Sequence, residues 1–190
     1  MRELVYYVAV SIDGYIAGPD GEFDAFLFEG DHAGCITAEL PDAIPTHIAD
    51  QLGIAQRRER FDTVLMGAGT YSVGLPDAPS PYRHLDQYLF THRAIAPQDN
   101  LTVTAEDPAH LVRELKAREG ADIWLCGGRN LAAQLAGEID RLVLKRNPVV
   151  FGAGIPLFAP GTYAPAQWDR VRAVAFDSGV VLEEYVRRQE

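Results

Sequence analysis

The sequence predicts an α/β protein built on a mainly parallel sheet, and three observations lead to that prediction. Strand-like and helix-like segments alternate up to about residue 145, a pattern typical of a parallel sheet with helices on both faces. Residues 4–10 (LVYYVAV) are apolar without interruption, as in a central strand buried on both faces. Two final strands, 171–176 and 180–186, flank Asp177-Ser178-Gly179, which indicates an antiparallel hairpin and therefore a mixed sheet.

In the first half of the chain, the sequence predicts secondary structure clearly in some segments and not in others. Residues 22–45 mix aromatic residues with glycine and proline, and no periodicity predicts an element there. Residues 46–60 are amphipathic and predict a helix, with Thr46 as the candidate N-cap. The other expected elements of this half are a loop over 14–21, a strand over 61–66, a turn over 67–69 and a short helix over 70–76.

The second half carries clearer boundaries. Asp107-Pro108 has the N-cap and first-turn proline of a helix, and Gly120 is its expected end. The remaining expected elements are strands over 87–90, 101–104, 122–125 and 139–145, a helix over 129–136, and a glycine- and proline-rich apolar segment over 148–158.

The composition sets the broad class of the protein. The 190 residues are 47% hydrophobic and 23% charged, as in ordinary globular proteins, and this length predicts one domain over residues 1–190. No apolar run approaches the roughly 20 residues of a membrane span, and no signal peptide is evident. Two cysteines and a net charge of −10 favour a cytoplasmic protein that binds neither nucleic acid nor an anionic membrane.

Two strand–glycine–helix turns are the strongest chemical signal in the sequence. They lie in residues 64–72 (VLMGAGTYS) and 123–135 (IWLCGGRNLAAQL). Glycine at the end of a strand lets a ligand phosphate approach the backbone, and the following helix presents free N–H groups. Two such turns in one parallel sheet predict a dinucleotide across its carboxyl edge. The alternative is that the glycines only permit tight turns.

The end of a third strand indicates which dinucleotide would bind. A Rossmann site for NAD expects an acid at the end of its second strand, whereas Thr91-His92-Arg93 follow the strand expected over 87–90. Hydroxyl, imidazole and guanidinium groups suit a 2′-phosphate. The triplet therefore favours NADPH over NADH, with a solvated loop arginine at position 93 as the alternative.

Four motifs in this order resemble the dihydrofolate reductase-like superfamily, in particular the C-terminal reductase domain of the riboflavin-biosynthesis deaminase–reductase. The resemblance spans nearly the whole chain and rests on residues 8–24, 64–71, 124–135 and 139–158. It implies a three-layer fold with a mixed sheet flanked by helices, NADPH as cofactor and a homodimer. A stand-alone reductase is implied, because the HxE and PCxxC motifs of zinc deaminases are absent from the sequence.

The resemblance also implies roles for individual residues. The backbones of Ala9 and Ile16 would hold the nicotinamide carboxamide, and Asp13 would border both nicotinamide and substrate. The residues implied to bind the rest of the cofactor are Gly67, Gly69 and Thr70 at one pyrophosphate turn, Cys126, Gly127, Gly128, Arg129, Asn130 and Leu131 at the other, and Thr91, His92 and Arg93 around the 2′-phosphate.

Two positions depart from the resembled pattern. Ala68 stands where the family often has an arginine that binds the 2′-phosphate, so selectivity for NADPH rests on His92 and Arg93. Tyr15 stands where the riboflavin branch often has a basic residue. This weakens a phosphoribosyl substrate and leaves room for a flatter, uncharged one.

Hydride transfer needs a planar C=N or C=O group beside the nicotinamide and a source of a proton. Asp13 and Asp31 are the candidate catalytic residues, and Asp31 is the nearest candidate for the carboxylate that grips the pterin in folate reductases. The alternative for Asp31 is a solvated loop acid. Three phenylalanines either stack on a heterocycle or form an ordinary half-buried face: Phe23, Phe26 and Phe28.

The sequence therefore predicts transfer of a hydride from NADPH to a pteridine-like or pyrimidine-like substrate. A non-catalytic nucleotide-binding or regulatory module remains the alternative, given Ala68 and the absence of a clear substrate carboxylate. No metal site is expected, because the histidines show neither HxH nor HExxH spacing. Cys126 at a helix start is a candidate for a lowered thiol pKa, although a fit beside the cofactor phosphates is the simpler interpretation.

Overall fold

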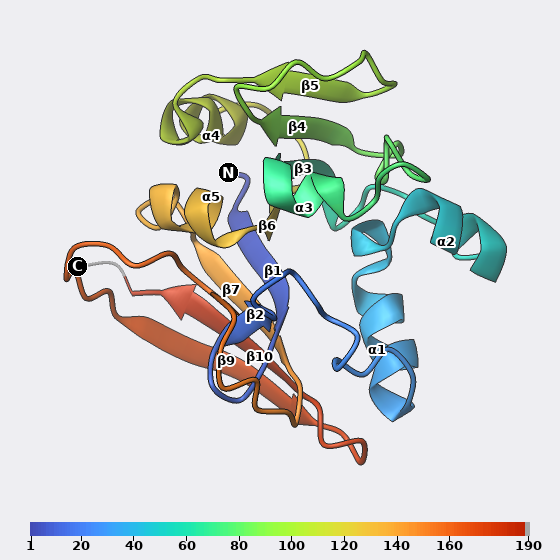
Figure 1. Cartoon of the computed structure of the whole chain (residues 1–190), viewed down its shortest axis with the longest axis vertical. Helices are drawn as coiled ribbons and strands as arrows, with labels where there is room; N and C mark the ends of the chain where they lie inside the picture. The colour runs from blue at the N-terminus through green and yellow to red at the C-terminus, as the bar shows by residue number, and fades with distance from the viewer. Residues whose placement is uncertain (189–190) are drawn as a thin grey trace.

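The computed structural model describes residues 1–188 and places an eight-stranded sheet at the centre of the protein (Figure 1). The strands lie in the order β5-β4-β3-β6-β1-β7-β10-β9. Their bounds are Leu4–Val10 (β1), Phe61–Gly67 (β3), Asp86–Phe90 (β4), Leu101–Thr104 (β5), Asp122–Gly127 (β6), Arg141–Arg146 (β7), Trp168–Ala175 (β9) and Val181–Arg187 (β10). Neighbours from β5 to β7 are parallel, whereas β10 runs antiparallel to β7 and β9. This confirms the predicted mixed, mostly parallel sheet.

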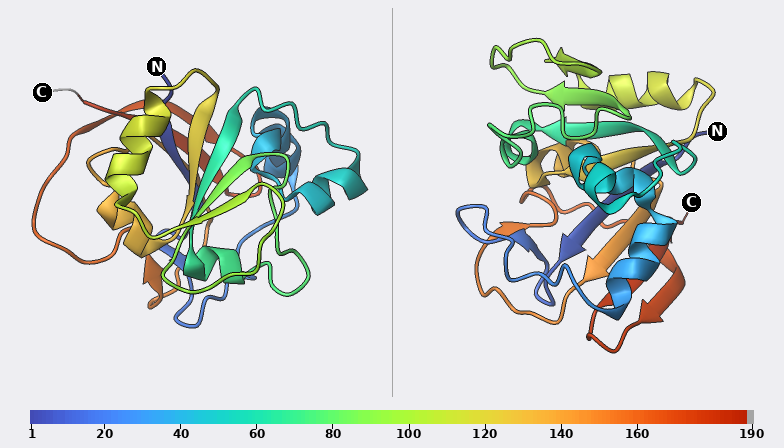
Figure 2. Two further views of the ribbon diagram at one scale, coloured as in Figure 1. Left: turned by 90° about the horizontal axis from the view of Figure 1, so that it is seen from above. Right: turned by 90° about the vertical axis from the view of Figure 1, so that its right-hand side faces the viewer.

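Helices cover both faces of the sheet, as Figure 2 shows from above. The helices α4 (Pro108–Lys116) and α5 (Arg129–Gln134) pack on one face, and α1 (Asp31–Glu39) packs on the other. Alternate residues of a strand therefore enter two separate cores, as Leu65 and Val64 do. The shorter helices are η1 (Pro41–Ala43), α2 (Thr46–Leu52) and α3 (Ala68–Ser72). No helix within residues 1–188 combines the length and the hydropathy needed to cross a bilayer.

The central position predicted for the first strand is confirmed. β1 lies between β6 and β7 and pairs with both in parallel. Leu4, Val5 and Tyr6 are each 0% exposed, as expected for an apolar strand that is covered on both faces.

Helices end earlier than the sequence predicts, as α2 and α4 show. The helix expected over 46–60 ends at Leu52, because Gly53 adopts a left-handed φ of 66° and caps it. Thr46 is its first residue rather than its N-cap, and its Oγ1 lies 2.7 Å from Nδ1 of His84. The expected N-cap of α4 is confirmed, since the Asp107 carboxylate accepts from the His110 N–H at 2.8 Å. However, α4 ends at Lys116 rather than at Gly120.

Four elements were not anticipated from the sequence: α1, η1, β2 and β8. α1 forms inside the segment that lacked periodicity, and it places Ile36 in the core beneath the sheet. β2 (Tyr15–Ala17) pairs antiparallel with β8 (Ile155–Pro156), where a loop and a glycine- and proline-rich segment were expected. This small second sheet joins two distant loops at the rim of the site described below.

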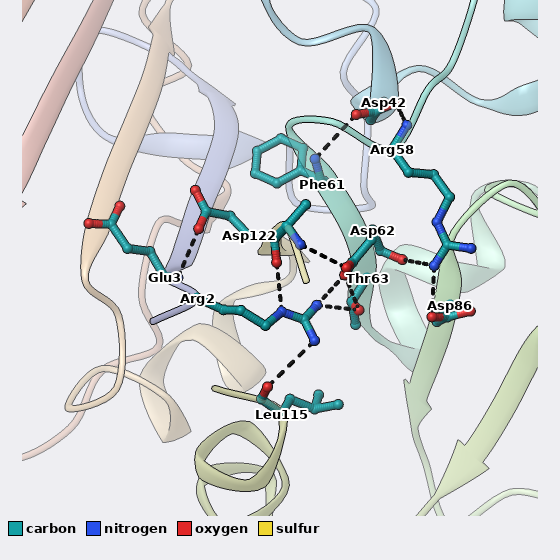
Figure 3. A network of polar contacts seen from close by, with 11 residues as sticks. Arg2, Glu3, Asp42, Arg58, Phe61, Asp62, Thr63, Asp86, Leu115 and Asp122 are labelled. Carbon is teal, nitrogen blue, oxygen red and sulfur yellow. Dashed lines mark hydrogen bonds and ion pairs between the residues drawn. The ribbon is translucent and has the colours of Figure 1, made fainter. Parts of the chain in front are cut away.

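A buried polar network ties together the amino ends of β3 and β6 (Figure 3). The Arg2 guanidinium forms an ion pair with Asp62, donates to Thr63 Oγ1 at 2.7 Å and donates through Nε to the Ala121 carbonyl at 2.6 Å. Asp62 also accepts the N–H of Ala121 at 2.9 Å. Arg2 is only 7% exposed. The network therefore holds the end of the sheet opposite to the carboxyl ends of the parallel strands.

Candidate functional site

The carboxyl ends of β4, β3 and β6 meet at one edge of the sheet, and a cleft opens there. Gly67 lies in register with Phe90 of β4, and Met66 lies in register with Gly127 of β6. The cleft has a volume of about 1560 Å³, which exceeds the roughly 300–1,000 Å³ of typical small-molecule pockets. It is large enough to take a dinucleotide together with a second small molecule.

The cleft extends toward the middle of the sheet because β1 and β6 separate. The two strands pair only through residues 4–6 of β1, whereas β1 continues to pair with β7 as far as Val10. Residues 7–9 of β1 and Cys126 of β6 consequently line the cleft instead of bonding to each other. A parting of neighbouring strands at the carboxyl edge is where open α/β sheets bind ligands.

The two glycine turns lie against each other inside this cleft. A Cβ atom built on Gly67 would lie 3.7 Å from both the Gly127 carbonyl oxygen and the Gly128 nitrogen. Cβ atoms built on Gly127 and Gly128 would lie 3.4 and 3.5 Å from Oγ1 of Thr70. The space that side chains would fill is left open, so an anion can approach the backbone N–H groups. The turns thus fit a pyrophosphate, although α3 and α5 are short helices.

Most residues expected to bind the cofactor line this one cleft: Ala9, Ile16, Gly67, Gly69, Thr70, Thr91, His92, Cys126, Gly128, Arg129, Asn130 and Leu131. Gly127 and Arg93 are not in the lining. Arg93 is exposed next to it, and its backbone N–H donates to Thr91 Oγ1 at 3.1 Å. Sequence reasoning missed the walls contributed by other segments, among them Ser72, Phe90, Gln134 and residues 104–108.

The two acids expected to be catalytic lie outside the lining of the cleft. The Asp31 carboxylate accepts from the backbone N–H groups of Asp177 and Ser178 at 2.6 and 3.1 Å. It therefore holds the turn between β9 and β10 against the start of α1. This position argues against the expected grip of Asp31 on a substrate. Its neighbour His32 is buried, and its two ring nitrogens form hydrogen bonds with Ser178 Oγ and the Leu27 carbonyl.

The Asp13 carboxylate also makes its hydrogen bonds outside the cleft, mainly with backbone N–H groups. It accepts from the Ser11 hydroxyl at 2.6 Å and from the N–H groups of Phe151 and Gly152 at 3.1 and 2.8 Å. The Ser11 hydrogen bond, helped by the two amides, lowers the pKa of Asp13 to about 2. Such a group stays ionised in the neutral range, so it cannot act there as the proton donor. It ties the loop before β2 to the loop before β8.

Replacing Asp13 with asparagine is expected to destabilise the protein in a pH-dependent way. The folded pKa lies below the ordinary value, so ionised Asp13 stabilises the folded state above the unfolded pKa of about 4. That contribution disappears as the pH falls through about 2. The Tm of Asp13→Asn should lie below that of the wild type at neutral pH, and the gap should close in acid. Thermal unfolding followed by circular dichroism measures both. Asp24→Asn is the control. A difference in Tm between the wild type and Asp13→Asn that stays the same at every pH would contradict the role assigned to Asp13.

An aromatic wall that no motif marks forms the other end of the cleft. Tyr7, Tyr82 and Trp124 all line it, with the Tyr82 and Trp124 rings in an edge contact at 4.8 Å between centroids. The Tyr82 hydroxyl lies 3.8 Å from Sγ of Cys126. Burial raises the pKa of the Cys126 thiol to about 12. This corrects the candidate lowered pKa, because Cys126 lies within β6 among buried aromatic rings rather than at a helix start.

The three phenylalanines considered for stacking also line the cleft: Phe23, Phe26 and Phe28. Their segment, residues 23–28, is held at its centre, where the Leu27 N–H donates to Asn147 Oδ1 at 3.0 Å and the Leu27 carbonyl accepts from Lys145 Nζ. We call residues 23–28 the aromatic segment. β7 therefore fixes this segment, through the side chains at its end, beside the aromatic wall.

Comparison with known proteins identifies a family that matches this chain and a relative with a similar sequence. The family described as RibD C-terminal domain matches residues 2–182. The protein YwjB of Bacillus subtilis (strain 168) is 33% identical over 164 residues, which cover 83% of each chain.

Solved structures share the fold. A putative riboflavin biosynthesis protein from Shewanella sp. PV-4 superposes over 100% of both chains with a TM-score of 0.74 and 20% identity. The Thermotoga maritima diaminohydroxyphosphoribosylaminopyrimidine deaminase/5-amino-6-(5-phosphoribosylamino)uracil reductase gives a TM-score of 0.65 at 16% identity, over 98% of this chain and 57% of that one. These superpositions confirm the dihydrofolate reductase-like architecture that the motifs predict. With its sequence matched almost from end to end, the chain belongs to the RibD C-terminal domain family.

Proposed function

We propose that this protein is an NADPH-dependent reductase that transfers a hydride to a small planar heterocycle of the pteridine or pyrimidine type. One observation carries the proposal: two glycine turns and a third strand end open into a single cleft whose far end is aromatic. Membership of a family named for a reductase-containing enzyme supports it.

The cofactor would lie across the carboxyl ends of β4, β3 and β6. Gly67, Gly69 and Thr70 would contact the pyrophosphate from one side, and residues 128–131 would contact it from the other. His92 lines the strand end where the 2′-phosphate would lie, and Arg93 follows it on the same loop. The nicotinamide would then reach the point where β1 and β6 separate, beside Ala9 and Ile16.

When bound, NADPH would supply a hydride and become NADP⁺. The substrate carbon of a C=N or C=O group gains that hydride, and its nitrogen or oxygen gains a proton that comes ultimately from solvent. The residues of this chain orient the substrate and limit access of water. Tyr82 lines the aromatic end, where its hydroxyl would donate a hydrogen bond to the atom that accepts the proton.

Cofactor preference gives the direct test. NADPH at millimolar concentration should raise the Tm more than NADH does, because a ligand that binds only the folded state stabilises it in proportion to its affinity. Arg93→Ala should weaken NADPH binding by about 1–3 kcal/mol if the guanidinium meets the 2′-phosphate, while NADH binding stays as it was. Differential scanning calorimetry and fluorescence titration measure the two effects. Arg57→Ala, at an exposed arginine, is the control, and equal or absent shifts with both cofactors would remove the proposal.

A further inference from the structure

We propose that the substrate of this reductase is an uncharged planar molecule without a phosphate group, hydrogen-bonded by the side chains of Tyr7, Tyr82 and Cys126. This inference rests on the proposed function and deepens it. It depends on the charges and hydrogen-bonding groups at one end of the cleft. We call this end the substrate end; it is built by β1, by β2 and the loop that follows it, by the aromatic segment, by Tyr82 and by the end of β6.

The substrate end offers a phosphate no basic partner. Among the described residues that line the whole cleft, the basic ones are His92 and Arg129. His92 follows β4 and Arg129 opens α5, so both belong to the cofactor half. The one acidic or basic side chain that lines the substrate end within residues 1–188 is Asp20. A phosphate there would meet a carboxylate on a chain of net charge −10, and no basic side chain of the described lining would offset the repulsion.

One basic residue, Lys145, pairs in the sheet with Ala9, which lines the cleft. Its ammonium group is already used. Nζ donates to the Leu27 carbonyl and lies 5.5 Å from the centre of the Phe28 ring. Lys145 is not in the lining of the cleft. Lys145 therefore holds the aromatic segment in place and does not present a charge to the substrate.

The groups that do face the substrate end are neutral hydrogen-bonding groups. Tyr7, Tyr82 and Cys126 line it together, and the Tyr82 hydroxyl approaches the Cys126 sulfur at 3.8 Å. Burial raises the pKa of all three, so each keeps its proton in the neutral range. The indole N–H of Trp124 donates to the Tyr7 carbonyl at 3.1 Å, which leaves the Trp124 ring as an apolar surface. Hydroxyl donors between aromatic rings suit the carbonyl and ring-nitrogen edge of a flat heterocycle.

Matched pairs of probes that differ only in a phosphate test the inference. We would titrate riboflavin against FMN, and 5-amino-6-(ribosylamino)uracil against its 5-phosphate, into the protein saturated with NADP⁺, using isothermal titration calorimetry. The uncharged member of a pair should bind at least about tenfold more tightly, as expected from one unfavourable charge contact. Equal or tighter binding of the phosphorylated members would overturn the inference. So would failure of both uncharged probes to bind at millimolar concentration.

Two substitutions locate the effect. Asp20→Lys should raise the affinity for the phosphorylated probes about tenfold relative to Asp20→Asn, because it adds a cation where the lining has none. Tyr82→Phe should weaken the uncharged probes about fivefold or more through loss of one hydrogen bond. If Asp20→Lys and Asp20→Asn bind the phosphorylated probes equally, or if Tyr82→Phe binds the uncharged probes as the wild type does, the assignment of the substrate end is wrong.

NADPH affinity in the same samples separates the two levels of the proposal. If the wild type does not bind NADPH, the proposed reductase function fails. If it binds NADPH and still prefers the phosphorylated probes, only the inference about the substrate fails. NADPH affinity also reports whether each variant is folded.

Discussion

Replacing Arg2 with alanine is expected to lower the free energy of unfolding by roughly 3–5 kcal/mol, because it leaves a mostly buried carboxylate without its cation. Arg2 and Asp62 have side chains that are 6% and 17% exposed. Thr63 and the carbonyl of Ala121 lose donors at the same time. Urea denaturation should show the loss directly, and the Tm should fall by roughly 6–20 °C for a protein of this size.

The chain contains a matched control for this prediction. Arg58 pairs with Asp86 at 2.8 Å, but these side chains are 41% and 55% exposed. Arg58→Ala should therefore cost less than about 1 kcal/mol. Arg2→Met keeps the apolar stem and should still lose most of the stability, whereas adding Asp62→Asn should recover part of it. A loss for Arg2→Ala no larger than that for Arg58→Ala would contradict a structural role for the buried pair.

The parallel framework was predictable because its signals are local. An uninterrupted apolar run marks β1, and glycine turns mark the ends of β3 and β6. The Arg2–Asp62 pair was not predictable, since its partners lie 60 residues apart and meet only after the sheet has formed. Nothing in the local sequence distinguishes Arg2 from the exposed arginines of the chain.

α1 shows why the segment from 22 to 45 resisted prediction. The helix includes Gly34 and has no side-chain cap at its start, so its own sequence favours it weakly. Burial of His32 and Ile36, and the Asp31 contacts with the hairpin between β9 and β10, supply the stabilisation. These contacts come from residues far away in the sequence, which also explains why Asp31 looked like a free acid.

The two halves of the candidate site differ in the same way. The cofactor half consists of strand ends followed by glycines, so most of its residues could be named from motifs. The substrate end combines a central strand, a loop before β4 and the aromatic segment. Tyr7 and Tyr82 are 75 positions apart in the sequence, and no spacing relates them. Only the positions of Phe23, Phe26 and Phe28 were available as candidates, and the sequence left two interpretations of them open.

A carboxylate at position 69 is expected to weaken NADPH binding by about 10–100-fold, while the neutral isostere at the same position weakens it far less. Gly69 lies in the first turn of α3 and lines the cleft, and no atom lies within 4 Å of a Cβ built there. The fold should therefore accept Gly69→Asp and Gly69→Asn equally. The aspartate would place a negative charge next to the pyrophosphate, a repulsion of roughly 1–3 kcal/mol at the rim of a cleft.

Comparison of the two variants isolates charge from shape, since their side chains have almost the same size. Without cofactor their Tm values should agree closely, because an acid near a helix start is well tolerated. In fluorescence titrations, the difference between their NADPH dissociation constants should shrink as salt is added, since screening acts on exposed charges. If the two variants had equal dissociation constants for NADPH at low salt, the pyrophosphate would not bind at the turn that follows β3. That result would remove the central support for a dinucleotide lying across this edge of the sheet.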